Sequence, residues 1–277
     1  MILVTGASGN VGGAVTQSLL TRRIPFRIGT RRPESAEAVA LDFRDPRTFR
    51  TAVRGCDAVF LLRPPAISST RKTLNPFLDA ARAEGVRQIV FLSVAGAPNN
   101  PLIPHFAVEQ RLKRGPGDWT ILRSGFFAQN FGEAYRQDIV EESRLFVPAG
   151  EGRVAFVDVR DIAEVAAGAL IDPALHSHKI YTLTGSEAIG FAEAAEILSC
   201  ELHRSVSYQP ASVFAYYRHL RRRRLPIGQI LVQTMLHVGL RFGQAEAIDE
   251  TLPCLLGHAS RTFADYVRDY RNLWNSE

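Results

Sequence analysis

Three glycines near the start of the chain have a spacing that suits phosphate binding. Gly6, Gly9 and Gly12 follow a short apolar run at residues 2–4, and an apolar stripe with helical spacing begins at Val11. Gly6 permits a tight turn, Gly9 allows a phosphate to approach the backbone, and Gly12 allows helix and strand to pack closely. The unpaired N–H groups and the dipole at the start of the helix attract an anion. The pattern predicts a strand–turn–helix site for a dinucleotide pyrophosphate, although spaced glycines alone can also mark only a tight turn.

The end of the second expected strand, at residues 26–30, distinguishes between the two nicotinamide dinucleotides. An acid there would accept hydrogen bonds from the ribose hydroxyls of NAD, but this chain has Arg31 and Arg32. A guanidinium group matches a 2′-phosphate, which an acid would repel. NADP(H) is therefore the expected cofactor, with two solvated loop arginines as the alternative. Asp42 follows the third expected strand and either accepts from the adenine amino group or caps a turn with Arg44.

The composition is that of an ordinary globular protein. The 277 residues are 46% hydrophobic and 22% charged, which is enough for one large core or two modest ones. There is no room for a leader before the strand at residue 2, and the most apolar late stretch, 227–240, is too short to span a bilayer. Cys56, Cys200 and Cys254 lie far apart, which argues against disulfides and a metal site. We therefore expect a cytoplasmic protein with no bound metal and no membrane partner.

Basic residues outnumber acidic ones, and most of them are arginine. The net charge is +5, and 30 of the 33 basic residues are arginines spread along the chain. The dense run at 221–224 lies just before Pro226 and fits the solvated end of a helix better than a nucleic-acid patch. Nucleic acid therefore ranks last among the partners, behind a small-molecule substrate, and a homodimer stays open.

Apolar strands alternate with helical stripes through the first half of the chain. One such stripe is formed by Val11, Val15 and Leu19, and helical segments between strands indicate a parallel sheet. The ligand crevice should then lie at the carboxyl ends of the strands, where Ser93 and Arg123 fall. The expected strands are 2–5, 26–30, 38–41, 58–62, 88–93 and 119–122.

The second half of the chain is less regular. Strands are expected at 154–157 and 179–183, with a helix over 161–170 that Asp161 caps. From Ser212 onward the pattern is helical. The last helix, 261–274, has a broad apolar face that must pack against another part of the protein.

With these residues in view, the chain resembles the NmrA-like branch of the atypical short-chain dehydrogenase/reductases over nearly its whole length. The resemblance implies an α/β fold, with a doubly wound parallel Rossmann sheet in an NADP-binding domain at 1–150. Residues 151–277 would then contribute a late sheet strand, at about 179–184, and a small, mostly helical C-terminal lid over the nicotinamide. The motifs are T-G-A-S-G-N-V-G at 5–12, T-R-R-P at 30–33, D-A-V-F-L-L-R-P-P at 57–65, F-L-S-V-A-G-A at 91–97, P-H-F-A-V-E at 104–109, D-W-T-I-L-R-S-G-F-F-A-Q-N at 118–130, V-D-V-R-D-I-A at 157–163 and R-T-F-A-D-Y-V at 261–267.

Two departures from the family pattern bear on the chemistry. Ser124 stands where many relatives have proline, and no Tyr-x-x-x-Lys pair occurs anywhere in the chain. The helix where that pair usually lies contains His105 and Glu109 instead. In carbonyl reductases the tyrosine protonates a developing alkoxide. Without it, hydride transfer needs another proton source or an acceptor, such as a quinone, that tolerates negative charge.

His105 and Glu109 are four residues apart on one helix face. An imidazole with the ordinary pKa of about 6.5 would serve as a general acid oriented by the carboxylate, and the alternative is a pair on a solvated surface. Ser93 would bind the nicotinamide ribose or a substrate oxygen, or else be a turn hydroxyl at a strand end. Phe126 lies just past the sixth strand, where the nicotinamide should stack, although a core position is the better expectation for a phenylalanine.

Two functions follow from these residues. The leading hypothesis is an NADPH-dependent reductase of a small conjugated or carbonyl-bearing molecule: a quinone, enone, imine or ketone. The alternative is a non-catalytic NADP(H) sensor that acts through a protein partner, which the missing tyrosine and lysine favour. A substrate pocket is favoured by the apolar and aromatic residues Phe214, Tyr216, Tyr217, Leu231 and Met235. The candidate catalytic residues are His105, Glu109 and Ser93, and the candidate cofactor-binding residues are Gly6, Ser8, Gly9, Asn10, Val11, Gly12, Arg31, Arg32, Asp42, Leu62, Arg63, Ser93 and Phe126.

Overall fold

The computed structural model describes residues 1–275 and divides the chain into two compact units. The first unit comprises residues 1–124, 159–183 and 251–257, and the second comprises the segments 125–158, 184–250 and 258 onward. The chain therefore passes back and forth between the units instead of dividing at one residue. From the sequence, a functional border is expected at residue 150, between the NADP-binding domain and the C-terminal region. That border is defined by function and not by these structural units, so it stays a prediction.

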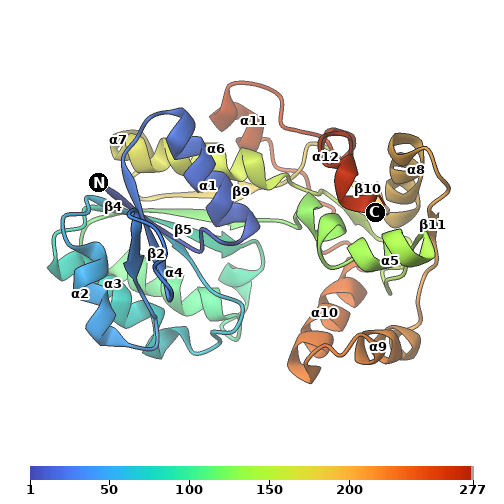
Figure 1. The fold of residues 1–277 in the computed structure, drawn as a ribbon, viewed down its shortest axis with the longest axis horizontal. Coiled ribbons are helices and arrows are strands. Elements are labelled where there is room, and N and C mark those ends of the chain that lie inside the picture. The colour runs from blue at the N-terminus through green and yellow to red at the C-terminus, as the bar shows by residue number, and fades with distance from the viewer. Residues whose placement is uncertain (276–277) are drawn as a thin grey trace. The chain divides into compact units, whose positions relative to one another are not determined.

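A seven-stranded parallel sheet forms the centre of the first unit (Figure 1). Its strand order is β3-β2-β1-β4-β5-β6-β9, so the order reverses between β1 and β4, where ligands bind in sheets of this kind. The predicted Rossmann-like α/β fold is thereby confirmed. The strands are β1 (Ile2–Thr5), β2 (Phe26–Thr30), β3 (Ala38–Ala40), β4 (Ala58–Leu62), β5 (Gln88–Val94), β6 (Asp118–Ser124) and β9 (Lys179–Leu183).

Helices cover both faces of this sheet. In Figure 1, α1 and α6 lie over one face, and α2, α3 and α4 lie over the other. Strands covered on both faces need continuous apolar runs, and β1 is buried at all four positions. The helices of this unit are α1 (Asn10–Thr21), α2 (Phe49–Val53), α3 (Leu74–Ala83), α4 (Pro104–Arg114), α6 (Val159–Ile171), α7 (Pro173–His176) and α11 (Thr251–Leu256).

The predicted cap at Asp161 is wrong. Helix α6 begins at Val159, so Asp161 lies within its first turn, where an acid still interacts favourably with the helix dipole. The helix therefore begins two residues before the start that was expected from the sequence.

The second unit consists mainly of helices with two small two-stranded sheets. The strands pair as β10 with β8, antiparallel, and β11 with β7, parallel. Its elements are α5 (Arg136–Glu142), β7 (Arg144–Leu145), β8 (Arg153–Val154), β10 (Ile189–Gly190), α8 (Phe191–Leu202), β11 (Ser207–Tyr208), α9 (Val213–Arg222), α10 (Ile227–Leu240) and α12 (Phe263–Asp269).

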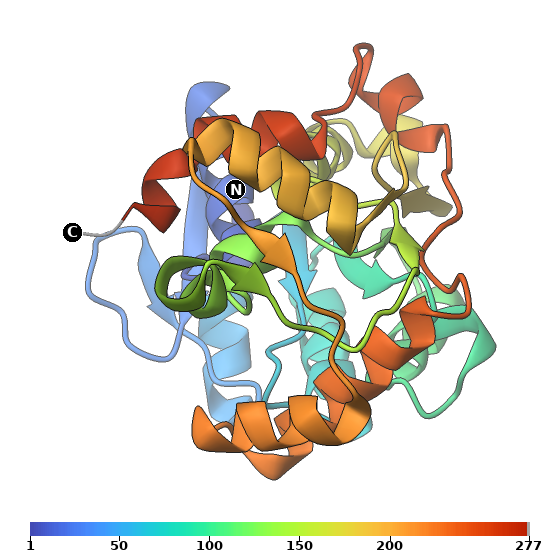
Figure 2. The ribbon, with the colours of Figure 1, turned by 90° about the vertical axis from the view of Figure 1, so that its right-hand side faces the viewer.

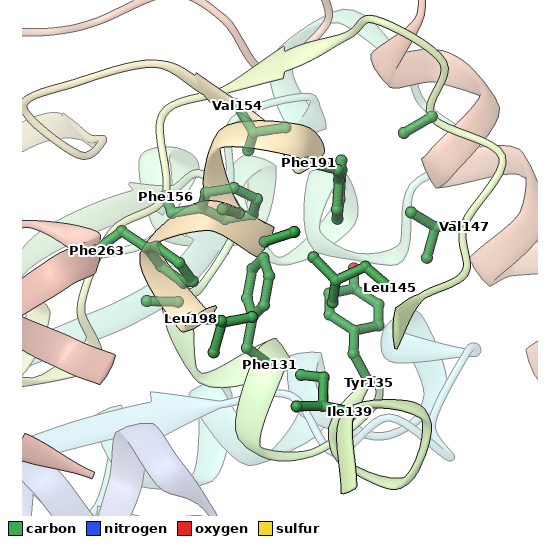
Figure 3. Close-up of a cluster of buried hydrophobic side chains, with 14 of the residues drawn as sticks. Phe131, Tyr135, Ile139, Leu145, Val147, Val154, Phe156, Phe191, Leu198 and Phe263 are labelled. Atoms are coloured by element: carbon green, nitrogen blue, oxygen red, sulfur yellow. The ribbon is translucent and has the colours of Figure 1, made fainter. Parts of the chain in front are cut away.

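An aromatic cluster forms the core of the second unit (Figure 3). Phe131 lies at its centre, with ring centroids 4.5 Å from Phe263 and 5.1 Å from both Tyr135 and Phe156. The apolar face expected over 261–274 contributes Phe263 to this core. The single long helix expected there is wrong, because α12 ends at Asp269 and a short 3₁₀ turn, Arg271–Trp274, follows.

Candidate functional site

The turn after β1 is built around its glycines. Gly6 has a φ of +70°, in the left-handed region that favours glycine, and a Cβ there would lie 3.1 Å from Cδ2 of Leu62. A Cβ at Gly12 would lie 2.1 Å from the carbonyl oxygen of Gly6, so only glycine lets α1 begin this close to the turn. A Cβ at Gly9 would meet only that same oxygen, at 3.6 Å, so Gly9 borders open space.

The first turn of α1 fits a pyrophosphate. Gly9 is the N-cap residue, no side chain caps the helix, and its first turn contains no acid. Ser8, Gly9 and Asn10 are exposed, whereas the side chain of Val11 is buried and leaves only its backbone N–H for a ligand. The uncapped N–H groups and the positive end of the helix dipole are therefore available to an anion.

Arg31 and Arg32 follow β2 and are both exposed. The N–H of Arg32 donates to Oγ1 of Thr30 at 3.3 Å, which shapes the turn after the strand. Neither guanidinium has a carboxylate partner in the part of the chain that the structure describes. Two uncompensated cations at this strand end match the two negative charges of a 2′-phosphate.

Asp42 takes part in a turn of its own backbone. Its Oδ1 accepts a hydrogen bond from the N–H of Arg44 at 2.9 Å, as the turn alternative predicted. A bond from Asp42 to an adenine amino group stays a prediction.

A buried polar network lies where β5, β6 and α4 meet. Pro104 occupies the first turn of α4, where its missing N–H costs nothing, and the helix then directs Glu109 inward. The sheet register places Ser93 opposite Arg123. Both side chains donate to Oε1 of Glu109, Ser93 Oγ at 2.7 Å and Arg123 Nε at 3.1 Å. Nη2 of Arg123 and Nζ of Lys113 donate to Oε2 at 2.7 and 3.4 Å.

This network keeps Glu109 ionised. Burial alone would raise the pKa of Glu109, but hydrogen bonds from Arg123 and Ser93 lower it below its ordinary value. Ser93 is fully buried and its hydroxyl proton points to the carboxylate. In this arrangement Glu109 holds Arg123, and Ser93 holds the carboxylate of Glu109, so the Ser93 hydroxyl does not serve a turn. Contact of Ser93 with the nicotinamide ribose or a substrate oxygen stays a prediction.

His105 is bonded to Arg63 and not to Glu109. Nε of Arg63 donates to Nε2 of His105 at 3.3 Å, and Nη1 of Arg63 donates to the carbonyl oxygens of Pro64, Pro65 and Ile67. An Nε2 that accepts a hydrogen bond leaves the ring proton on Nδ1, which is buried without a partner among the described residues.

The expected chemistry of His105 therefore changes. The pKa of His105 is lowered to about 4, mainly by burial and also by the positive charge of Arg63, while the carboxylate of Glu109 opposes the shift. The predicted imidazole of ordinary pKa, oriented by Glu109, is wrong, because burial lowers the pKa of the ring and its hydrogen-bond partner is Arg63. The alternative of a solvated surface pair is also wrong, because both side chains are buried. Participation of His105 in the reaction stays a prediction.

Two features of the site were not anticipated from the sequence. Arg123 was noted only as a strand-end residue, and its partnership with Glu109 was missed; the available signal was a cation that ends a buried apolar strand. Arg63 was expected to bind the cofactor, but its hydrogen bond to His105 was not foreseen. Phe126 belongs to the second unit and packs against the aromatic cluster there, so its stacking role stays a prediction.

Comparison with known proteins supports the dinucleotide interpretation of this geometry. A family model described as NAD(P)H-binding matches residues 6–173, which include the glycine turn and the Glu109 network. No helix in the described part of the chain combines the length and apolar character that crossing a membrane requires.

Three proteins of known activity are similar to this chain along almost its full length. The NAD(P)H azoreductase of Xenophilus azovorans is 31% identical, over 97% of each chain. The structure of the Citrobacter sp. triphenylmethane reductase with NADP(H) superposes with a TM-score of 0.87 at 25% identity, covering 97% of this chain and 99% of that one. The NADPH-dependent quinone oxidoreductase QOR2 of Escherichia coli, solved with NADPH, gives 0.84 at 26% identity over 99% and 100%.

Proposed function

The chain belongs to the NAD(P)H-binding family, in its NmrA-like atypical short-chain branch, and from this premise we propose that it transfers hydride from NADPH to a small conjugated acceptor. It is an NAD(P)H-dependent oxidoreductase. Quinones, enones, imines and ketones are the candidate acceptors, and we place quinones and other charge-delocalising molecules first.

The geometry of the first unit supports the cofactor-binding roles that we propose. The N–H groups at the start of α1 would hold the pyrophosphate, with Gly9 leaving room for it. Arg31 and Arg32 would bind the 2′-phosphate of NADPH, because no acid neutralises them in the part of the chain that the structure describes. When bound, the cofactor supplies the hydride, and the protein orients the acceptor and excludes water.

The choice of acceptor rests on one observation: His105, the expected acid of the site, is buried and accepts a hydrogen bond from Arg63, so the ring is neutral and a poor proton donor at neutral pH. The pKa of His105 is about 4 and that of Glu109 is lowered, so the first is a neutral ring and the second a carboxylate. A ketone needs a proton as the alkoxide forms, whereas a quinone spreads the added charge over its ring and takes a proton from water afterwards. The site is therefore better suited to quinones, dyes and similar acceptors.

The charged side chains have a supporting role in this scheme. Arg123 is held by Glu109, whose carboxylate also accepts from Ser93, and Arg63 is held by His105 and three carbonyl oxygens. We propose that His105, Glu109 and Ser93 keep these two guanidinium groups in place beside the cofactor site. Their positive charge would stabilise negative charge that develops on the acceptor.

The names of the relatives agree with this choice of substrate. An azo dye, a triphenylmethane dye and a quinone are flat conjugated acceptors, and the proteins named for them cover almost the whole chain.

We also propose a cytoplasmic location, since Cys56, Cys200 and Cys254 are all free thiols. A homodimer stays a prediction.

Turnover of a substrate panel tests the proposal. NADPH oxidation would be followed with a benzoquinone, a naphthoquinone, an azo dye, an enone, an imine and a simple ketone. We expect turnover of the quinones or the dye and at least tenfold lower kcat/KM for the ketone. Ketone reduction as fast as quinone reduction would contradict the proposed acceptor class. Tight NADPH binding with no turnover of any acceptor would favour a cofactor-sensing protein.

A further inference from the structure

The positive charge of the protein is concentrated in one part of the second unit. Residues 202–245 contain seven arginines and no aspartate, glutamate or lysine, which gives a net charge of +7 against +5 for the whole chain. The other 233 residues carry 26 basic and 28 acidic side chains, a net charge of −2. The basic character of the chain therefore comes from this segment alone.

Four of these arginines face solvent around helix α9. Arg218, Arg221, Arg222 and Arg224 are exposed, and none of them has a carboxylate partner in the described part of the chain. The neighbouring Arg223 is different: it donates to Oδ1 of Asp138 at 2.6 Å and to His219 at 3.0 Å. One arginine of the run thus joins α9 to α5, and the others are left as free cations.

The adjacent helix α10 exposes an apolar face. Ile227, Leu231 and Met235 lie four residues apart and are 53%, 58% and 67% exposed. Helix α10 contains no charged residue apart from the titratable His237, which is buried. Val232 and Leu236 widen the same face, with 53% and 44% exposure.

Helices α9 and α10 pack against each other, so the cations and the apolar face belong to one local structure, the basic hairpin (Val213 to Leu240). Figure 2 shows the two helices side by side, in orange. Phe214 on α9 is 68% exposed, and the guanidinium of Arg218 lies 5.6 Å from its ring. An exposed aromatic ring beside free arginines and a bare aliphatic helix is unusual for a surface in contact with water only.

We propose that the basic hairpin binds the surface of a lipid bilayer that contains anionic lipids. Aliphatic side chains of α10 and the ring of Phe214 would enter the boundary between headgroups and acyl chains, while the arginines contact the acidic headgroups. The proposal does not rest on the reductase activity. It gives Phe214, Leu231 and Met235, which are exposed, a different role from the substrate pocket that they favoured in the sequence pattern. It differs from the expectation of no membrane partner, which rested on the lack of a spanning segment and not on the surface of the folded protein.

Charge and chemistry favour this occupant over two others. A second copy bound through the same face would bring two segments of charge +7 together, which is strongly repulsive. Nucleic acid would satisfy the arginines but leave the aliphatic face of α10 without a partner, because such interfaces are polar. A bilayer with acidic headgroups accommodates both parts of the hairpin.

Vesicle flotation with the full-length protein tests the proposal. We expect binding to vesicles of phosphatidylcholine with phosphatidylglycerol, and at least tenfold weaker binding to phosphatidylcholine alone. Binding should weaken when salt rises from about 0.1 M to about 1 M, because the screening length falls from about 10 Å to about 3 Å. Arg221→Gln/Arg222→Gln should weaken it by about 25-fold, at about fivefold for each arginine near an anionic surface.

Matched variants test whether vesicle binding depends on the hairpin or on positive charge and exposed apolar side chains anywhere on the protein. Leu231→Gln/Met235→Gln should weaken vesicle binding at least tenfold, while circular dichroism and NADPH affinity remain as in the wild type. Arg22→Gln/Arg23→Gln removes the same charge from the exposed end of α1, and Leu102→Gln/Leu175→Gln removes two exposed leucines from the first unit; both should bind vesicles normally.

Three results would overturn the proposal. One is binding that does not depend on anionic lipid, or that the first-unit variants reduce as much as the hairpin variants. Another is tight, salt-sensitive binding of a DNA or RNA duplex with none to vesicles. The third is a dimer, seen by light scattering, that Leu231→Gln/Met235→Gln dissociates, since that face would then be occupied by a second copy.

Discussion

Arg123 and Glu109 form an ion pair with 2.7 Å between Nη2 and Oε2, and their side chains are only 15% and 1% exposed. Such a pair is not a large source of net stability, because removing two charges from water offsets most of their attraction. The ion pair instead fixes the positions of the two side chains. Each stays in place because moving away would leave the other as a buried charge without a partner.

Removing both partners should cost less stability than the two single losses added together. Glu109→Gln or Arg123→Met should each lower the free energy of unfolding by about 3 kcal/mol, and the double variant should lose clearly less than their sum. Urea denaturation measures all three. The exposed pair of Arg111 with Asp79 supplies the control, and Asp79→Asn should change stability by less than about 1 kcal/mol. Additive losses would show that the two side chains act independently.

The same pair has a predictable acid response. Because the pKa of Glu109 is lowered in the folded protein, its stabilising contribution is present above the unfolded value of about 4.3 and is lost as the pH falls below it. The difference in stability between wild type and Glu109→Gln should therefore narrow in acid. A constant difference down to about pH 3 would contradict the lowered pKa.

Two buried histidines should destabilise the protein on mild acidification. Burial lowers the pKa of both His105 and His237 to about 4, so both are neutral when folded but take up a proton when unfolded below about pH 6.5. Their stabilising effect is complete above that pH and is lost as the pH falls toward 4. Between pH 7.5 and 5, each should cost about 2 kcal/mol, and His105→Phe should remove its share of that dependence. A stability that does not fall between pH 7.5 and 5 would contradict the lowered pKa values of these two histidines.

The neutral state of His105 also has a kinetic signature. A histidine with a pKa of about 4 contributes no ionisation to kcat/KM between pH 6 and 8. We expect the pH profile of quinone reduction to lack a histidine-dependent fall on the alkaline side, and His105→Phe to lower quinone turnover less than tenfold. An alkaline limb near pH 6.5 that His105→Phe abolishes would restore the general-acid role.

Cofactor preference should depend on the arginines after β2. NADP(H) should bind at least tenfold more tightly than NAD(H), equivalent to about 1.4 kcal/mol, and Arg31→Ala/Arg32→Ala should remove that preference. Calorimetric titration with both cofactors measures it. Arg22→Ala/Arg23→Ala, elsewhere on the same unit, should retain it. Equal affinity of the wild type for both cofactors would show that the two arginines are solvated and do not bind the 2′-phosphate.

Two glycines in the same turn should respond differently to substitution. Gly9→Val should abolish NADP(H) binding and leave the fold intact, because a Cβ there meets only the Gly6 oxygen, at 3.6 Å, and extends into the space for the pyrophosphate. Gly12→Ala should instead impair folding, since its Cβ would lie 2.1 Å from that oxygen. Calorimetry and thermal unfolding separate the two effects. A folded Gly9→Val protein with normal affinity would place the phosphates elsewhere.

The sequence predicted the sheet well because buried parallel strands are continuous apolar runs. The bounds expected for β1, β2 and β4 are those of the structure, and the late strand at Lys179–Leu183 joins the sheet beside β6. Helical spacing also placed His105 and Glu109 on one face correctly, and both are buried.

The partners of those two residues could not be predicted in the same way. Periodicity shows which face of α4 turns inward, but the contacts of Glu109 depend on the register that sets Ser93 opposite Arg123. The pKa of His105 depends on burial and on Arg63, a residue 42 positions away in the sequence. The local sequence pattern predicts which face of a helix is buried. The pKa of a side chain on that face depends instead on the groups, distant in the sequence, that contact it.

The interleaving of the two units has a consequence for synthesis on the ribosome. Residues 125–158 emerge before α6 and β9, although these two later elements belong to the sheet unit. Until residue 183 has emerged, β6 is an unpaired edge that can recruit another nascent chain. A fragment ending at residue 150 would keep that edge permanently. Expression trials should therefore treat the chain as one indivisible folding unit, with aggregation as the expected fate of any truncated chain that stops before β9.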